Sequence, residues 1–211
     1  MGIELVQTDG IFALDGGEWE VTNNIWIVGN DAEVIVIDAA HDASAIAAAV
    51  NGRDVIAIAL SHGHNDHINA AIALQDLVDA PILLHPDDRM LWDVVYPDVG
   101  PDRELVEGEI LKAGGTSLLA LHTPGHSPGC ICFLDQTKED GTGHLFSCDT
   151  LFCGGPGATG RSHSSFETII RSIRERLLDL PPETIVHTGH GDSTTIGDEA
   201  PHLEEWLARG H

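Results

Sequence analysis

Short hydrophobic runs alternate with helical patterns over most of the chain. Two β-branched runs at 24–29 and 33–38 flank a Gly-Asn-Asp turn, which predicts an antiparallel strand pair. Further strands are expected at 54–60, 81–85, 117–121, 131–135, 144–149 and 184–187. Helices are expected at 42–50, 66–78, 87–95, 166–177 and 200–208. The alternation indicates an α/β fold, and no linker or low-complexity segment divides residues 1–211, which predicts a single domain.

The predicted strands end in histidine and aspartate residues. Asp38, the loop at 62–67, His126, Asp149 and His190 each follow a hydrophobic run. Ligands of α/β sheets bind where strands reach their carboxyl ends. These side chains are therefore expected to share one site.

The loop at 62–67, with the sequence HGHNDH, is the most informative motif. In an extended loop, His62 and His64 point the same way and can bind one metal ion. Asp66 and His67 fall where the next helix begins and can turn toward a second ion. The helix N-terminus is expected to disfavour protonation of His67, which keeps it a ligand at neutral pH. Burial of so polar a cluster without a metal would be costly, so metal binding is predicted.

The loop alone cannot fill two coordination shells, and three strand-end residues complete the set. We expect Asp149 to bridge two ions together with a hydroxide, because a carboxylate has two oxygens. One ion would be held by His62, His64 and His126, and the other by Asp66, His67 and His190. Imidazole and carboxylate ligands suit divalent metals, with zinc expected and iron or manganese as alternatives.

Four motifs in this order, HGHNDH, TPGHSPG, SCDTLF and TGHG, resemble the metallo-β-lactamase fold superfamily. The stretch from Asp149 to Arg161 is similar to glyoxalase II-like thioesterases. The resemblance covers roughly residues 20 to 200. It implies an αββα four-layer sandwich, with two mixed sheets, helices on the outer faces and metals in a cleft at the sheet edges. It also implies the ligand roles assigned above.

Three departures from that family pattern bear on the substrate. Cys148 stands where the family usually has glycine before the bridging aspartate, which places a thiol near the metals. The family's GRTD stretch reads Gly-Arg-Ser-His at 160–163. The glyoxalase II helical C-terminal domain, which helps to hold glutathione, is not expected in this chain. Another low-molecular-weight thiol is therefore an open alternative as the acyl carrier.

Several residues outside the ligand set are candidates for other roles. Arg161 and His163, after the glycine-rich loop, are expected to contact substrate. Asp38 is expected to orient metal-binding loops through hydrogen bonds, although an ordinary capping role is equally open. The other histidines, His41 among them, are expected to be ordinary. A serine nucleophile at Ser127 is disfavoured, because Pro128 has no N–H for an oxyanion hole.

Composition limits the partners and the compartment. The chain has 34 acidic and 10 basic residues and a formal net charge of −24, which disfavours nucleic acids and anionic membranes as partners. The sequence has no run of 18 apolar residues and no secretory signal pattern, so a cytoplasmic protein is expected. Four cysteines without a CxxC pair predict no disulfide framework. The oligomeric state is left open.

Together these features predict a metal-dependent hydrolase of small acyl thioesters. A metal-bridging hydroxide would attack the acyl carbon, and Asp66 would orient it while binding metal. Two rival reactions remain on the same scaffold. One is hydrolysis of lactones or other esters, and the other is persulfide oxidation at a single iron. A metal-free binding module is the remaining alternative.

Overall fold

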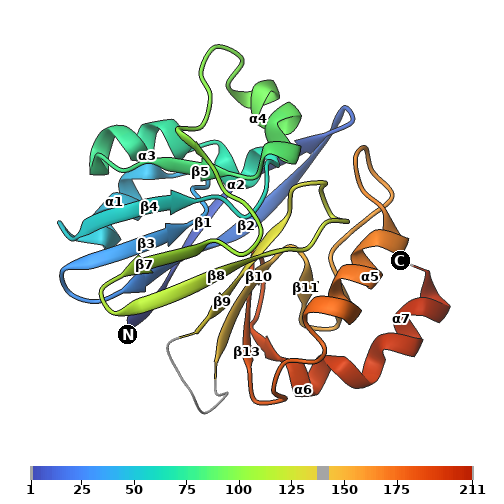
Figure 1. Cartoon of the computed structure of the whole chain (residues 1–211). Helices are drawn as coiled ribbons and strands as arrows, with labels where there is room; N and C mark the ends of the chain where they lie inside the picture. The colour runs from blue at the N-terminus through green and yellow to red at the C-terminus, as the bar shows by residue number, and fades with distance from the viewer. Residues whose placement is uncertain (1, 137–142, 211) are drawn as a thin grey trace.

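Two stacked sheets of mixed strand direction form the centre of the molecule (Figure 1). The computed structural model describes residues 2–136 and 143–210. Within them the first sheet has, in spatial order, β1 (Gly2–Leu14), β2 (Gly17–Gly29), β3 (Glu33–Ile37), β4 (Asp54–Ala59), β5 (Ile82–Leu84) and β6 (Arg103–Glu104). The pairs β1–β2 and β2–β3 are antiparallel, and the pairs β3–β4, β4–β5 and β5–β6 are parallel.

The second sheet is built from the C-terminal half. Its spatial order is β14 (Thr194–Thr195), β13 (Ile185–Thr188), β10 (His144–Cys148), β9 (Ile131–Asp135), β8 (Thr116–His122) and β7 (Ile110–Ala113). The pair β10–β13 is parallel and the other pairs are antiparallel. A separate short pair joins β11 (Leu151–Phe152) to β12 (Gly155–Pro156).

Helices cover the outer face of each sheet, as Figure 1 shows. On the first sheet lie α1 (Ala43–Val50), α2 (Asn65–Ile68), α3 (Ala71–Val78) and α4 (Arg89–Val95), the last after a 3₁₀ turn at Pro86–Asp88. On the second lie α5 (Phe166–Arg176), α6 (Ile196–Glu199) and α7 (Leu203–Arg209), the last after a 3₁₀ turn at Ala200–His202. No helix in the described part of the chain is both long and apolar enough to cross a membrane.

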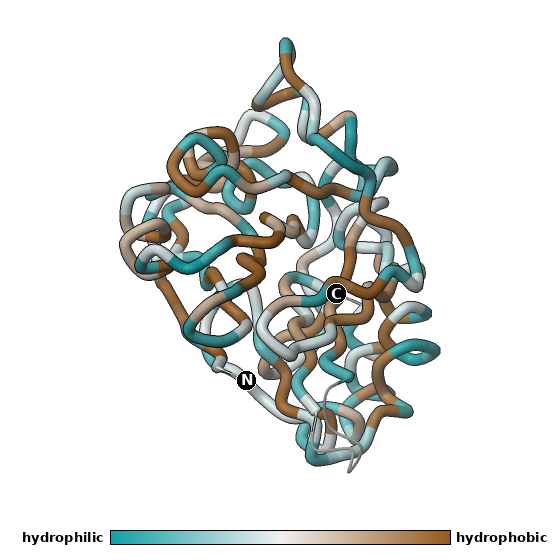
Figure 2. The backbone as a smooth tube through the Cα atoms, turned by 60° about the vertical axis from the view of Figure 1, so that its left-hand side comes forward, coloured by the Kyte–Doolittle hydropathy of each residue, from teal (hydrophilic) through white to brown (hydrophobic). Residues whose placement is uncertain are grey.

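Three hydrophobic layers separate the four structural layers. Ile46 and Leu74 pack between helices and the first sheet. Ile35 and Phe133 meet between the two sheets, and Ile173 packs between α5 and the second sheet. Figure 2 shows hydrophobic and hydrophilic stretches alternating along the backbone of both sheets and their helices. The αββα sandwich expected from the sequence is confirmed.

The prediction of one continuous helix at 66–78 is wrong. The helix expected at 66–78 is two helices, α2 and α3, with a break at Asn69 and Ala70. The Ala70 N–H donates to the Ala39 carbonyl at 3.0 Å instead of continuing the helix. A tertiary hydrogen bond from the loop after β3 therefore overrides the apolar periodicity.

The longest strand pair was not predicted. β1 and β2 form a ribbon paired along their whole length, from Gly2 with Gly29 to Leu14 with Gly17, whereas only 24–29 was expected to be extended. Most of the ribbon is partly exposed on both faces, so it lacks a continuous buried stripe. The hairpin of β9 and β10 is confirmed, and most of its expected turn at 140–143 lies outside the described residues.

Candidate metal centre

The seven predicted ligands converge at one end of the two sheets. β4 leads into the HGHNDH loop, and α2 begins within it, so that Asp66 and His67 occupy its first turn. From the second sheet, His126 follows β8, Asp149 follows β10 and His190 follows β13. Ligands from both halves of the sequence thus meet between the sheet ends.

The first donor group consists of His62, His64 and His126. The Nδ1 atom of His64 lies 3.0 Å from Nε2 of His62 and 3.0 Å from Nε2 of His126. The outward nitrogens of two of the rings are held by neighbours: Nδ1 of His62 lies 3.0 Å from the Ser61 hydroxyl, and Nδ1 of His126 lies 2.8 Å from the Ala158 carbonyl. Nε2 of His64 is buried without a hydrogen-bond partner among the described residues. The three imidazoles are therefore aimed at one point.

The second donor group consists of Asp66, His67 and His190. The Nε2 atoms of the two histidines lie 3.2 Å apart, and Oδ2 of Asp66 is 3.4 Å from Nε2 of His190. Behind the group, Asp38 Oδ2 lies 2.9 Å from Nδ1 of His67. The Thr22 carbonyl lies 2.8 Å from Nδ1 of His190. Asp38 thus lies against the imidazole of His67, one of the predicted ligands.

Asp149 lies between the two groups. Its Oδ2 atom is 3.5 Å from Nε2 of His126 and 3.5 Å from Nε2 of His190. Its Oδ1 atom lies 3.4 Å from Nε2 of His67. A Cβ atom on Gly189 would come within 2.0 Å of that Oδ1, so glycine leaves room for the carboxylate. The geometry suits a carboxylate shared by two cations.

The donor atoms fit divalent cations. In the first group the three inward nitrogens crowd together, and within the described residues Oδ1 of Asp149 is a buried oxygen without a hydrogen-bond partner. Two buried carboxylates, Asp66 and Asp149, add negative charge. Such a cluster is stable when a cation satisfies the lone pairs. Nitrogen and carboxylate donors suit zinc, iron or manganese.

The two groups differ in their affinity for protons. Burial lowers the pKa of His62 well below its ordinary value and that of His64 to about 3. Burial also acts to lower the pKa of His67 and His190, but nearby carboxylates, Asp149 foremost, outweigh it. The pKa of His67 is therefore raised well above its ordinary value, and that of His190 is raised to about 10. The expectation that the helix N-terminus disfavours protonation of His67 is wrong for the metal-free chain, because the carboxylates dominate.

Asp88, which was not among the residues predicted from the sequence, connects two loops that carry candidate ligands. It is fully buried, and its carboxylate accepts hydrogen bonds from the N–H groups of Gly63 at 2.7 Å and Gly129 at 2.6 Å. It also accepts one from the Ser127 hydroxyl at 2.6 Å. A Cβ atom on Gly129 would approach Asp88 Cγ to 2.8 Å. Asp88 thus fixes the loops that carry the first donor group.

A cavity of about 270 Å³ opens above the donor atoms. Its lining consists of Phe12, Trp19, Val21, His64, Asp66, His126, Asp149, Phe152, Ala158, Arg161 and His190. The Arg161 guanidinium lies 3.7 Å from the centroid of the Trp19 ring. No carboxylate of the described chain forms an ion pair with it. The cavity therefore combines a metal-binding floor, an aromatic wall and one cation.

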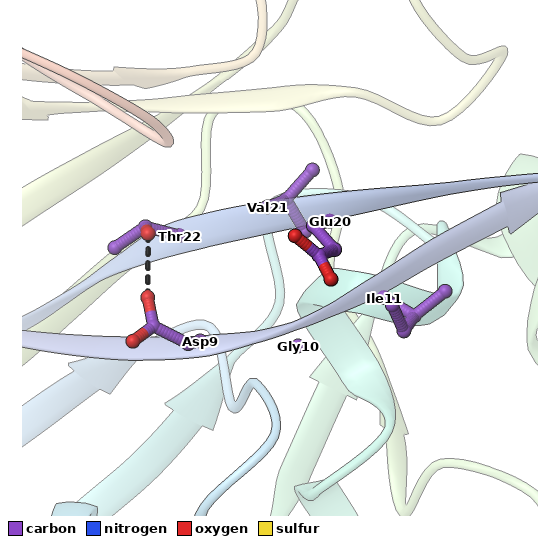
Figure 3. Close-up of a pocket in the computed structure, with 6 residues that line it drawn as sticks. All are labelled: Asp9, Gly10, Ile11, Glu20, Val21 and Thr22. Atoms are coloured by element: carbon purple, nitrogen blue, oxygen red, sulfur yellow. Dashed lines mark hydrogen bonds between the residues drawn. The ribbon is translucent and has the colours of Figure 1, made fainter.

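His163 lies outside this cavity. It is exposed, and it lines a separate hollow together with Leu14 and Met90. A third hollow lies on the β1–β2 ribbon and is lined by Asp9, Gly10, Ile11, Glu20, Val21 and Thr22 (Figure 3). None of the predicted ligands lines either hollow. Of the two predicted substrate contacts, the structure brings only Arg161 to the metal cleft.

The sequence profile of the Metallo-beta-lactamase superfamily matches residues 19–190. The matched segment contains both donor groups and Asp149. The chain belongs to the metallo-β-lactamase superfamily. Members of this superfamily typically bind divalent metals, in agreement with the clustered histidines and aspartates.

Three relatives of this metallo-β-lactamase superfamily chain carry informative names. It is 39% identical over 153 residues to "Hydroxyacylglutathione hydrolase GloC" of Haemophilus influenzae, covering 66% of this chain and 70% of that one. It resembles the structure of "TTHA1623 in a di-iron-bound form" with a TM-score of 0.74 and 34% identity, covering 85% and 93%. It resembles "BLEG-1 B3 metallo-beta-lactamase" with a TM-score of 0.76 and 29% identity, covering 93% and 98%.

Two features of this superfamily member stand out in the sequence: the pair Asn23–Asn24 was missed, and Cys148 was noted as a departure from the family pattern. Asn23 and Asn24 open a hydrophobic strand although asparagine is a poor strand former, and both are buried. Asn23 donates to Asp66 Oδ2 at 3.1 Å. Cys148, which replaces the usual glycine, has a φ of 45°, in the left-handed region that favours glycine. Its thiol packs in the core between the sheets, and burial raises its pKa well above the ordinary value.

Proposed function

We propose that this chain hydrolyses small acyl thioesters. One observation carries the proposal: two donor groups joined by Asp149 form the floor of a small cavity whose wall presents a single cation, Arg161. When bound there, two divalent cations supply an activated water at neutral pH and polarise the substrate's carbonyl oxygen. The name of the Haemophilus influenzae relative, a hydroxyacylglutathione hydrolase, supports a thioester as the substrate.

The chain's own residues position the reactants. Asp66 is held by the amide of Asn23, which leaves its carboxylate fixed toward the cavity floor to orient the attacking water. His62 and His64 have a lowered pKa and remain neutral, so they act as ligands and not as acids. Among the described residues that line the cavity there is no serine or cysteine nucleophile. Water is therefore the nucleophile in this proposal.

The reaction is a simple exchange of bonds. The water oxygen forms a bond to the acyl carbon, and the carbon–sulfur bond breaks with its electron pair leaving on sulfur. The proton lost from water is balanced by the proton that the thiolate takes up. The products are a carboxylic acid and a free thiol, and no external oxidant or reductant is consumed.

Arg161 is the reason that we propose a substrate whose thiol part carries a negative charge. The contact with the Trp19 ring holds the guanidinium at the cavity wall and leaves its N–H groups available to a carboxylate or phosphate. Phe12 and Phe152 offer an apolar surface beside it. We propose a small thioester with an anionic tail on the thiol as the substrate, and we propose neither nucleic acid nor membrane as a partner, in view of the net charge of −24.

The direct test is a substrate panel on protein loaded separately with zinc, iron or manganese. Hydrolysis of S-lactoyl and S-formyl thioesters, followed by release of free thiol, is the expected result. Faster turnover of lactones would replace the proposal with ester hydrolysis. Oxygen uptake on a persulfide, with one bound iron, would replace it with the dioxygenase reaction. The di-iron form of the TTHA1623 relative is the reason to include iron beside zinc.

A second experiment tests the role of Arg161. We expect Arg161→Gln to raise KM for a glutathione thioester about tenfold, because a charge-assisted contact is lost, with little change for a neutral N-acetylcysteamine thioester. His163→Gln is the matched control, since this residue of the same loop lies outside the cavity. Equal effects of Arg161→Gln on the charged and neutral substrates would contradict the assignment.

A further inference from the structure

Two local irregularities meet beside the second donor group. His41 has a φ of 59°, in the left-handed region that non-glycine residues rarely adopt. Across from it, Gly10 of β1 has no side chain, and a Cβ there would come within 2.1 Å of the His41 ring. Figure 3 shows Gly10 on the ribbon beside β2. The position of this imidazole therefore requires a strained backbone at His41 and the absence of a side chain at Gly10.

The hydrogen bonds of His41 run in one direction. Oδ1 of Asn69 accepts from the His41 backbone N–H at 2.7 Å, so its Nδ2 faces the ring and donates to Nδ1 at 2.9 Å. Because Nδ1 accepts, Nε2 carries the hydrogen and donates to Oδ1 of Asn23 at 2.9 Å. The amide of Asn23 then points its Nδ2 at Oδ2 of Asp66, 3.1 Å away.

We propose that His41 is a positioning residue for the second metal ion: through Asn23 it fixes the carboxylate of Asp66. The inference rests on the two-ion centre of the proposed function and not on the identity of the substrate. Each link has only one consistent assignment of donor and acceptor, since the ionised carboxylate at the end can only accept. The chain therefore determines which way the Asn23 amide faces.

The hydrogen-bonded relay of Asn69, His41, Asn23 and Asp66 begins beside the break between α2 and α3. Asn69, its first member, is the C-cap of α2 and keeps helical backbone angles. The left-handed backbone at His41 and the glycine at position 10 are two departures from local preference. One role, holding Asp66, accounts for both.

The relay serves only one of the two donor groups. Asn23 contacts Asp66 and lies 3.3 Å from Nε2 of His67, and both belong to the second group. The first group is supported by Ser61 and Asp88, neither of which belongs to the relay, and Asp38 touches Ser61 and His67 alike. Loss of the relay should therefore weaken the second ion and spare the first. Partners behind a metal ligand typically change metal affinity by about 10- to 100-fold.

The test compares His41→Leu with His41→Gln in the full chain. Both residues meet the same left-handed backbone, but only glutamine can accept from Asn69 and donate to Asn23. Zn²⁺ is titrated against a chromogenic chelator, and Co²⁺ spectra report each site separately. We expect the dissociation constant of the second ion to rise at least about tenfold in His41→Leu, to recover in His41→Gln, and the first to stay within about twofold.

Gly10→Ala, on β1, should disturb the same relay without changing His41 itself. Its methyl group would displace the His41 ring, so it should weaken the second ion as His41→Leu does. Gly2→Ala is the matched control, because its Cβ would meet only the Gly29 carbonyl oxygen at an ordinary 3.7 Å. Unchanged second-ion affinity in His41→Leu, or equal weakening of both ions, would overturn the inference while the proposed function stands. A wild-type chain that binds a single ion would instead overturn the two-ion centre.

Discussion

The first and second donor groups each present three ligand atoms, but they differ in charge and in what supports them. The first is made of imidazoles only, and burial keeps the pKa of His62 and His64 below the ordinary value. The second contains Asp66, and carboxylates hold protons on His67 and His190 in the metal-free chain. Neutral imidazoles are ready to bind metal, whereas protonated ones must first release a proton. The two halves of one centre should therefore fill under different conditions.

The supports differ in the same way. The first group is held by Ser61, the Ala158 carbonyl and the buried carboxylate of Asp88, which accepts from Gly63 and Gly129. The second group is held by Asp38, the Thr22 carbonyl and the Asn23 relay. Asp38 touches both groups, because it also accepts from the Ser61 hydroxyl, whereas Asp88 and Asn23 each support one group.

Removing Asp149, which the two groups share, should have the largest effect. Asp149→Ala is expected to lower kcat/KM more than about a hundredfold and to reduce bound metal, since even partners behind a ligand cost 10- to 100-fold. Metal content and thioester turnover measured on the same sample check this. Asp179→Ala, at an exposed position, is the control. Full activity in Asp149→Ala would refute the shared-carboxylate centre.

Asp88 tests the support of the first group alone. Asp88→Ala would leave two N–H groups and the Ser127 hydroxyl without their buried acceptor, and we expect it to lower the free energy of unfolding by about 3 kcal/mol. Urea denaturation measures the change. The first ion should be weakened more than the second. Asp87→Ala is the control, because that side chain is 59% exposed. Equal weakening of both ions would remove the proposed division of supports.

The sequence was informative about the candidate ligands and uninformative about the residues that support them. The candidate ligands were predicted from HGHNDH and from single residues at strand ends, because ligand chemistry restricts residue type and strand ends share one edge. The α/β class followed from the alternation of hydrophobic runs, and the αββα layers followed from the resemblance of the four motifs to the metallo-β-lactamase superfamily. The supports could not be identified in this way, because Asp88 and His41 act through tertiary contacts that leave no periodic pattern.

The β1–β2 ribbon was missed for a related reason. Its partly exposed faces carry no stripe, yet it supplies Phe12 and Trp19 to the cavity and Asn23 to Asp66. The helix at 66–78 was drawn as continuous because its apolar spacing says nothing about the hydrogen bond from Ala70 to Ala39. His163 was expected in the cavity from its place after the glycine loop, but the loop turns it outward.

The pH dependence of metal binding separates the two groups. Protons remain on His190, with a pKa of about 10, and on His67 at neutral pH, and the second ion must displace them. Its affinity should rise about tenfold per pH unit for each proton released, from pH 6 to pH 9. His62 and His64 carry no proton in that range, so the first ion should bind with a much smaller slope. Chelator competition across pH measures both, and parallel slopes would contradict the comparison.

The smallest expected effect is on acid stability, and it concerns His187 on β13, the strand that leads to His190. His187 stacks on Phe146 with ring centroids 4.8 Å apart, and its Nε2 lies 2.9 Å from Nδ1 of His144. Burial foremost, and then the charge of His144, lower the pKa of His187 to about 4. Below an unfolded-state pKa of about 6.5, the unfolded chain binds a proton that the folded chain refuses, so stability is lost as pH falls toward 4.

His187→Phe should remove that penalty in the metal-free protein. At pH 5 we expect the variant to lose about 1 to 2 kcal/mol less unfolding free energy, relative to pH 7.5, than the wild type does. Urea denaturation of both proteins in chelator provides the comparison, with the exposed His202→Gln as control. Since β13 carries His190 into the cleft, acid that loosens this strand should release the second group before the first. Identical acid sensitivity of wild type and variant would show that the strand beneath the second group does not sense pH.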